Sequence, residues 1–124
     1  MSLRSPIGIA LGKGAAGGAM HHWWMQRVTA VALVPLTLWL VFAYSGLPSL
    51  EYGVVLEWLA SGWTALWMSL FIVASVWHSM LGVQVVIEDY VSGSAKTVVL
   101  LLSQFAHVIV GAASLFAVLR IALR

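Results

Sequence analysis

The charged residues of this chain are spaced so widely that three long uncharged stretches remain. These stretches are 28–50, 58–87 and 97–119, and each is rich in aliphatic and aromatic side chains. A helix needs about 20 apolar residues to cross the hydrocarbon core of a bilayer. The pattern therefore predicts three membrane-spanning helices, at about 24–45, 63–88 and 97–119.

Small residues and turn formers set the expected limits of these spans. Ser45 and Pro48 end the first, and Ser61 and Gly62 precede the second after a short surface segment at 51–60. The second and third spans are expected to be joined by a loop of about seven residues, within the usual range for helix connections.

Residues 1–22 are expected to form a flexible tail outside the membrane, and 23–124 a three-helix membrane anchor. Five glycines interrupt the tail, and its apolar stretch at 6–11 is too short for the hydrophobic region of a signal peptide. The tail also lacks the Arg- and Ser-rich character of a transit peptide. A bacterial inner membrane is therefore the expected location, with a mitochondrial inner membrane less favoured.

The positions of Lys and Arg predict the orientation of the chain in the membrane. The side shared by the N-terminus and the second loop carries four of them: Arg4, Lys13, Arg27 and Lys96. The opposite side carries Arg120 and Arg124. This excess places the N-terminus in the cytoplasm.

Composition supports an all-α integral membrane fold and excludes several other classes. Hydrophobic residues make up 62% of the 124 residues and charged residues only 8%, against about 25% charged in soluble domains. The net charge of +2 comes from scattered residues, so nucleic acid is not an expected partner, whereas membrane lipid is. The chain has no cysteine, which excludes disulfides and thiolate metal sites.

The most informative residue is His78, which lies ten residues before Glu88 and hence roughly 15 Å inside the membrane boundary. An ionisable residue at this depth often marks a functional site, and imidazole is a common ligand of haem iron. The alternative is a structural histidine bonded to a neighbour such as Ser75. Gly82, one turn further on, would let a flat macrocycle approach the helix, although small residues also serve helix packing.

Asp89 and Tyr90 follow the second span. Eleven residues separate His78 from Asp89, so both face the same way if the helix continues. A phenol beside a carboxylate at an apolar rim can bond a carbonyl group and connect it to a supply of protons. The alternative is that these residues only end the helix at the membrane surface.

His107 lies at nearly the depth of His78, with Gly111 one turn further on. A haem held by both histidines of one chain is conceivable, but helices joined by a short loop pack about 8–10 Å apart, and a haem between them needs a wider gap. A facing helix from another chain suits the geometry better. We therefore favour a packing or supporting role for His107.

His21, His22 and Arg27 stand near the start of the first span beside two tryptophans. They are either an interfacial belt with a snorkelling cation or partners for acidic groups, such as haem propionates or a lipid headgroup.

Two segments resemble the small cytochrome b membrane anchors of succinate dehydrogenase, respiratory complex II. The first, at 21–30, reads HHWWMQRVTA, and the second, at 78–91, reads HSMLGVQVVIEDYV. The second carries the family's pattern of a His, a Gly four residues on, and Asp-Tyr at eleven and twelve.

The resemblance implies that His78 is an axial ligand of a b-type haem, whose other ligand comes from a companion cytochrome b anchor. It implies that Tyr90 bonds a carbonyl of ubiquinone with Asp89 in the proton path, and that Arg27 and His21 contact the haem propionates. The iron–sulfur and flavoprotein subunits are the further partners implied. His22 and His107 match no motif of the family.

The sequence is compatible with three alternatives. The first is an anchor of the related fumarate reductase, because the sequence of an anchor does not fix the direction of the reaction. The second is a structural or assembly membrane protein without a cofactor. The third, a small component of a transporter, would be expected to show interrupted spans in paired halves, and no such pairing is present in the sequence.

Overall fold

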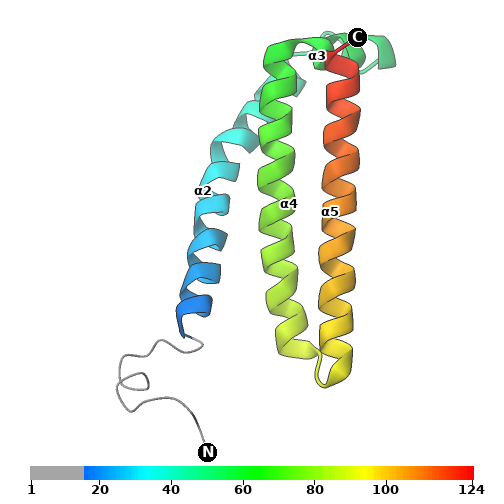
Figure 1. The fold of residues 1–124 in the computed structure, drawn as a ribbon. Coiled ribbons are helices and arrows are strands. Elements are labelled where there is room, and N and C mark those ends of the chain that lie inside the picture. The colour runs from blue at the N-terminus through cyan, green and yellow to red at the C-terminus, as the bar shows by residue number, and fades with distance from the viewer. Residues whose placement is uncertain (1–15) are drawn as a thin grey trace, which may run out of the picture.

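The computed structural model describes the chain from residue 16 to residue 124. In this range the chain forms helices joined by short connections, with no strand (Figure 1). The helices are α2 (Ala16–Ser45), α3 (Tyr52–Ala60), α4 (Gly62–Tyr90) and α5 (Ser94–Ala122). The all-α fold expected from the sequence is confirmed.

Three of these helices are long and apolar enough to cross a membrane, as predicted. The candidate spans are Met20–Ser45, Gly62–Tyr90 and Ser94–Ala122. A helix of 29 residues is about 44 Å long at 1.5 Å per residue, whereas the hydrocarbon core is about 30 Å thick. The ends of α4 and α5 therefore extend beyond the hydrocarbon.

Helix α2 begins earlier than the sequence pattern predicts. It starts at Ala16, inside the segment 1–22 expected to be a tail, and continues through Gly17 and Gly18. Glycine costs a helix only about 1 kcal/mol relative to alanine, so two glycines do not end a helix that continues into an apolar run. The rest of the expected tail, 1–15, lies outside the described residues.

The connection between α4 and α5 is shorter than the expected loop of about seven residues. It consists of 91–93, because both helices extend further toward each other than predicted. Gly93 has a φ of +69°, a left-handed conformation that glycine adopts without a steric penalty. This one residue lets the chain reverse direction within a short turn.

Helix α4 lies in the middle of the molecule, with α2 packed on one side and α5 on the other (Figure 1). Helix α3 crosses the upper end of the molecule and contacts α4 and α5. The start of α2 and the turn between α4 and α5 lie at the lower end, whereas the C-terminus lies at the upper end.

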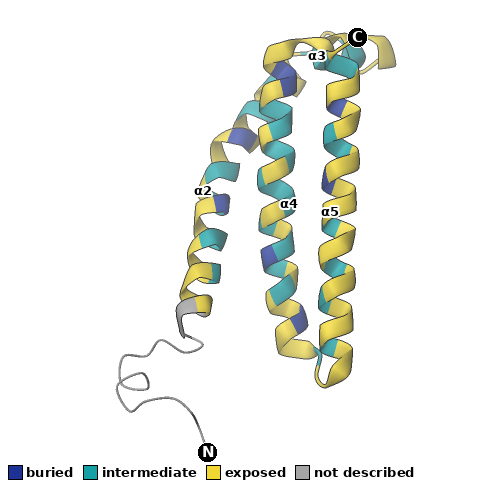
Figure 2. Ribbon diagram, in the orientation of Figure 1, coloured by how far each residue is buried: buried dark blue, intermediate teal, exposed yellow. Residues whose placement is uncertain are grey.

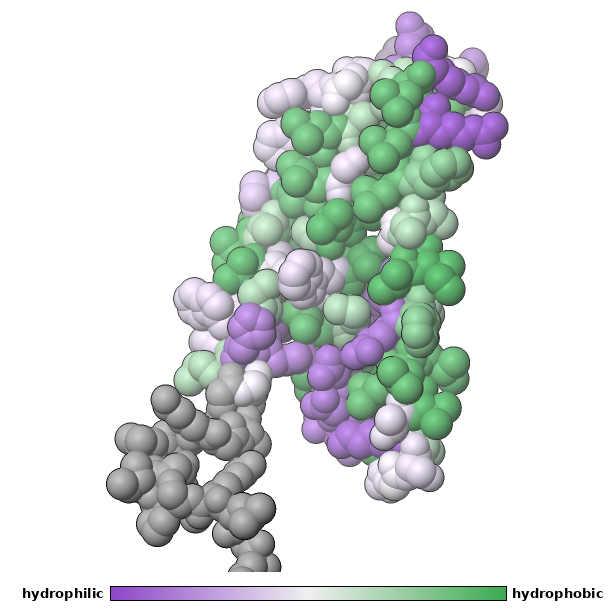
Figure 3. Space-filling view, viewed as in Figure 1, coloured by the Kyte–Doolittle hydropathy of each residue, from purple (hydrophilic) through white to green (hydrophobic). Residues whose placement is uncertain are grey.

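Most of the helical surface is exposed and apolar. Few residues are buried in the described range, and they lie where helices touch (Figure 2): Thr29, Leu36, Thr64, Ala65, Leu81, Ile87, Gly111 and Val118. The space-filling view shows a broad hydrophobic zone with hydrophilic atoms toward both ends (Figure 3). Such a surface is expected to face lipid or other membrane helices.

Aromatic rings join the helices at the upper end. Trp39 of α2 stacks on Trp58 of α3, with ring centroids 6.2 Å apart, and on Trp67 of α4 at 5.7 Å. Aromatic pairs at these separations contribute about 0.5–1.5 kcal/mol each beyond the area that they bury. This end of the α2–α4 pair is closed by rings, and the space between the helices lies toward the other end.

Candidate functional site

His78 lies near the middle of α4, and its ring contacts α2. It is twelve residues from Tyr90 at the helix end, or about 18 Å along the helix axis. Its Nδ1 atom lies 3.0 Å from Oγ1 of Thr29, and its Nε2 atom lies 3.4 Å from Nε2 of Gln26. The bonding partner on the Nδ1 side is thus Thr29 of α2 rather than the neighbouring Ser75.

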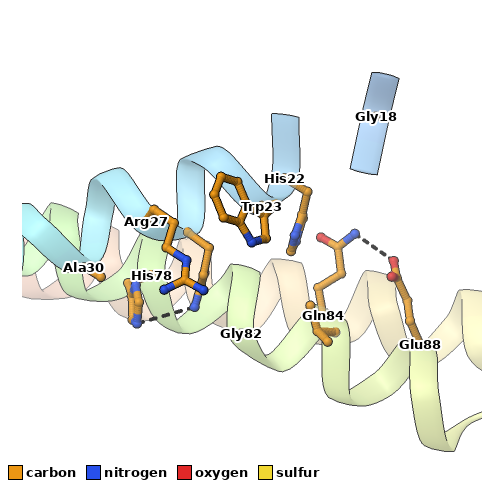
Figure 4. Close-up of a pocket in the computed structure, with 11 residues that line it drawn as sticks. Gly18, His22, Trp23, Arg27, Ala30, His78, Gly82, Gln84 and Glu88 are labelled. Carbon is orange, nitrogen blue, oxygen red and sulfur yellow. Dashed lines mark hydrogen bonds between the residues drawn. The ribbon is translucent and has the colours of Figure 1, made fainter. Parts of the chain in front are cut away.

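A cavity of about 770 Å³ lies between the lower halves of α2 and α4 (Figure 4). This volume is within the usual range of about 300–1,000 Å³ for cofactor sites. Its lining includes four side chains of α2 with polar atoms and three of α4: His22, Trp23, Gln26, Arg27, His78, Gln84 and Glu88. Gly18, Ala30, Gly82 and Val85 complete it. His78 therefore lines a cavity of cofactor size beside the candidate membrane span of α4.

Groups of both charges line the cavity, with Arg27 near His78 and Glu88 further toward the lower end (Figure 4). The guanidinium of Arg27 lies 5.2 Å from the centroid of the Trp23 ring, a cation–π distance. On α4, the amide of Gln84 donates to Oε1 of Glu88 at 2.8 Å. Lys96 donates from Nζ to the backbone carbonyl of Glu88 at 2.9 Å, which brings a second cation to this end of the helix pair.

The residues around the cavity fit a haem. His78 lines the cavity with its Nε2 beside the amide of Gln26, while Oε1 of Gln26 and Nε2 of His22 are buried without a hydrogen-bond partner in the described part of the chain. A Cβ atom added to Gly82 would lie 3.5 Å from Nε2 of Gln26. The absence of a side chain at Gly82 therefore leaves space in the cavity one turn from His78. No group of three or more potential metal-ligating side chains occurs among the described residues. A single histidine suits an iron that the macrocycle already holds.

Sequence reasoning missed two residues of this site, Gln26 and Thr29. His22, Gln26 and Thr29 follow one another at spacings of four and three and so share one helix face. This spacing is the sequence signal that could have identified Gln26 and Thr29. Of the two adjacent histidines, His22 lines the cavity, whereas His21 is exposed and lies outside its lining. The expected contact of His21 with a haem propionate stays a prediction.

His107 lies on the other side of α4, between α4 and α5. A carbonyl oxygen can only accept, so Nδ1–H of His107 donates to the backbone carbonyl of Ser103 at 2.8 Å. Nε2 of His107 then accepts from the Ser79 hydroxyl at 3.1 Å. Both ring nitrogens of His107 are engaged between α4 and α5, as those of His78 are between α4 and α2, but His107 does not line the cavity that His78 lines. This geometry supports the packing role and disfavours a haem held between the two histidines.

Asp89 and Tyr90 end α4 and are both exposed, with Tyr90 87% exposed. Neither lines the 770 Å³ cavity. They lie at the lower end of the molecule, beside the turn into α5. The described part of this chain therefore does not enclose a molecule that binds Asp89 and Tyr90.

Residues 1–119 match a family described as the succinate dehydrogenase/fumarate reductase transmembrane subunit. The chain belongs to this family. It is 35% identical over 89 residues to the succinate dehydrogenase hydrophobic membrane anchor subunit of Rickettsia bellii, covering 72% of this chain and 71% of the relative. The membrane anchor subunit of Paracoccus denitrificans is 28% identical over 96% of this chain and 92% of its own length. That of Reclinomonas americana is 33% identical over 66% and 70%. No solved structure matches the chain.

Family membership confirms the resemblance carried by 21–30 and 78–91. Together with the three apolar helices, it identifies a multi-pass membrane anchor of succinate dehydrogenase. Such an anchor is one subunit of the enzyme and does not catalyse the reaction alone.

Proposed function

We propose that this anchor supplies His78 as one axial ligand of a b-type haem, shared with a companion cytochrome b anchor, and forms part of the site that reduces ubiquinone. The observation that carries the proposal is the position of His78, near the middle of a spanning helix and in the lining of a 770 Å³ cavity. An imidazole at this depth is costly to maintain without a role. Since α2 and α4 bound the cavity on one side, a helix of the companion anchor has space to supply the second ligand.

Within this site, each residue of the chain has a distinct task. His78 would hold the iron through Nε2, while Arg27 and either His22 or His21 would supply positive or hydrogen-bonding groups to the propionates. The amide of Gln26, whose Oε1 lacks a partner among the described residues, can turn to bond the edge of the group. When bound, the haem supplies one-electron redox chemistry, and the protein contributes binding and orientation.

Ubiquinone is proposed to bind at the end of α4. Its reduction consumes two electrons and two protons. The Tyr90 hydroxyl donates a hydrogen bond to one carbonyl, and the adjacent carboxylate of Asp89 connects that oxygen to water. Both residues are exposed in the chain alone, which suits a site completed by the companion anchor and the iron–sulfur subunit. The flavoprotein subunit oxidises succinate and is the source of the electrons.

The orientation proposed for the complex places the start of α2 and the turn between α4 and α5 on the cytoplasmic side of a bacterial inner membrane. These segments lie at one end of the molecule (Figure 1), and Arg27 and Lys96 belong to that end. Succinate oxidation is favoured over fumarate reduction as the working direction, because the curated relatives are named succinate dehydrogenase subunits.

A dithionite-reduced minus oxidised optical spectrum tests the haem assignment. The complex is purified through this chain as wild type, His78→Ala and His107→Ala. We expect His78→Ala to abolish the b-type bands and His107→Ala to retain them. Loss of the bands in both variants would favour a haem held within the chain. A wild-type complex without the bands would overturn the haem assignment and leave the anchor and quinone roles.

A further inference from the structure

Thr29 connects the backbone of α2 to the ring of His78. The residue is buried, with 7% of its surface exposed. Its Oγ1 lies 2.9 Å from the carbonyl oxygen of Met25 and 3.2 Å from that of Gln26. Carbonyl oxygens only accept, so the single hydroxyl proton of Thr29 is directed to the backbone of its own helix.

This arrangement offers an acceptor to a His78 ring that binds a metal through Nε2. Such a neutral imidazole carries its proton on Nδ1. Nδ1 lies 3.0 Å from Oγ1 of Thr29, which can accept this proton because its own proton can go to a backbone carbonyl. The lone pair is then on Nε2, beside Gln26 of the cavity lining.

The contact with Gln26 is consistent with the same tautomer. The amide nitrogen of Gln26 lies 3.4 Å from Nε2 of His78 and can donate to it when Nε2 is unprotonated.

We propose that Thr29 is a positioning residue for the iron ligand. By accepting the hydrogen bond from Nδ1, it holds the orientation of the ring and keeps the lone pair of Nε2 directed into the cavity. A hydrogen bond to the other ring nitrogen also makes a metal-bound imidazole more basic. The inference rests on the proposed haem ligation by His78, and it adds the residue that prepares this ligand.

The test compares Thr29→Val, Thr29→Ser and Thr64→Val in the intact complex. Valine keeps the shape of threonine but removes the hydroxyl, whereas serine keeps the hydroxyl. Thr64 is an equally buried threonine, at 6% exposure, and it lies about 21 Å along α4 from His78. It controls for the loss of any buried hydroxyl.

We expect Thr29→Val to retain haem roughly 10- to 100-fold less tightly, the usual effect of losing a partner of a metal ligand. Its haem midpoint potential should shift to more positive values, because a less basic ligand stabilises the oxidised iron less. Thr29→Ser should restore both quantities, and Thr64→Val should resemble the wild type. A purely structural role for Thr29 would lower complex stability without moving the potential.

The two proposals fail in different ways. Wild-type haem retention and potential in Thr29→Val would overturn the role of Thr29, even if His78→Ala loses the haem as expected. Retention of the haem bands in His78→Ala would remove the ligand assignment itself and the role of Thr29 with it.

If Thr29→Val does not assemble, the same bond can be tested with Thr29 in place. His78→Gly complex is titrated with imidazole, with 1-methylimidazole, which cannot donate to Thr29, and with 4-methylimidazole, which controls for the added methyl group. We expect imidazole and 4-methylimidazole to restore the b-type bands at lower concentrations than 1-methylimidazole. Equal restoration by all three compounds would contradict the proposal.

Discussion

Gly111 of α5 lies directly against Val76 of α4. A Cβ atom built on Gly111 would lie 3.3 Å from Cγ1 of Val76, closer than an ordinary van der Waals contact. The missing side chain therefore lets the two helix backbones approach each other closely, as small residues do at membrane helix interfaces. The same contact positions Ser79 and His107 of the two helices for their hydrogen bond.

Replacing Gly111 with leucine is expected to lower the free energy of unfolding by about 1–3 kcal/mol, the usual cost of overpacking. Gly111→Ala should change it little, because alanine gains roughly 0.5–1 kcal/mol of helix stability against a small displacement of Val76. Thermal denaturation of the purified complex measures both effects. Gly53→Leu is the control, since nothing lies within 4 Å of a Cβ there. Equal losses at 53 and 111 would show that the close contact is unimportant.

The Ser79–His107 hydrogen bond is expected to hold α4 to α5 without contributing to the cofactor. Hydrogen bonds between membrane helices contribute on average about 0.6 kcal/mol and at most ~1.7 kcal/mol. His107→Ala and Ser79→Ala should each lower stability by an amount in this range, and the double variant should lose less than the sum. The optical spectrum should not change. A coupling energy of zero in the double-mutant cycle would contradict the interhelical bond.

His22 and His21 are expected to differ in their effect on the haem site. Because His22 lines the cavity and has a buried Nε2 without a partner among the described residues, His22→Ala should weaken haem retention by several-fold, as should Arg27→Gln. His21 is exposed, and it does not line the cavity in the chain alone. Haem content after dialysis of the purified complex measures the difference. A larger effect from His21→Ala would support the family-based assignment of His21 to a propionate instead.

The spans and the position of His78 along its helix could be predicted from the sequence because both depend on local quantities. Hydrophobic run length determines where a helix can cross, and counting residues from the helix end determines how far along the axis a side chain lies. The boundaries were less accurate. The start of α2 at Ala16 and the short turn at Gly93 depend on how far each helix extends beyond the hydrocarbon. The length of an uncharged run does not predict that extension.

The partners of His78 could not be predicted in the same way. Ser75 is the neighbour that the sequence suggests because it is one turn away, but the ring contacts Thr29 and Gln26, about 50 residues away. Which face of α2 meets α4 depends on the rotation of two packed helices, and no single-helix pattern fixes that rotation. For the same reason, sequence alone could not decide between His21 and His22, which differ by about 100° around the helix.

A substitution at Tyr90 is expected to affect ubiquinone reduction without affecting succinate oxidation. Its hydroxyl is the only difference between tyrosine and phenylalanine, and 87% exposure of the residue in the chain alone means that the fold does not depend on it. If the hydroxyl bonds the quinone carbonyl, Tyr90→Phe should reduce ubiquinone reductase activity by about tenfold, the equivalent of ~1.4 kcal/mol. Succinate oxidation with an artificial acceptor should be retained, because the acceptor takes the electrons before they reach the quinone site in the membrane.

Tyr52→Phe is the matched control, since Tyr52 is also exposed but begins α3 at the opposite end. Equal loss of both activities in Tyr90→Phe would place the defect in assembly, and unchanged activities would exclude the phenol from the quinone site.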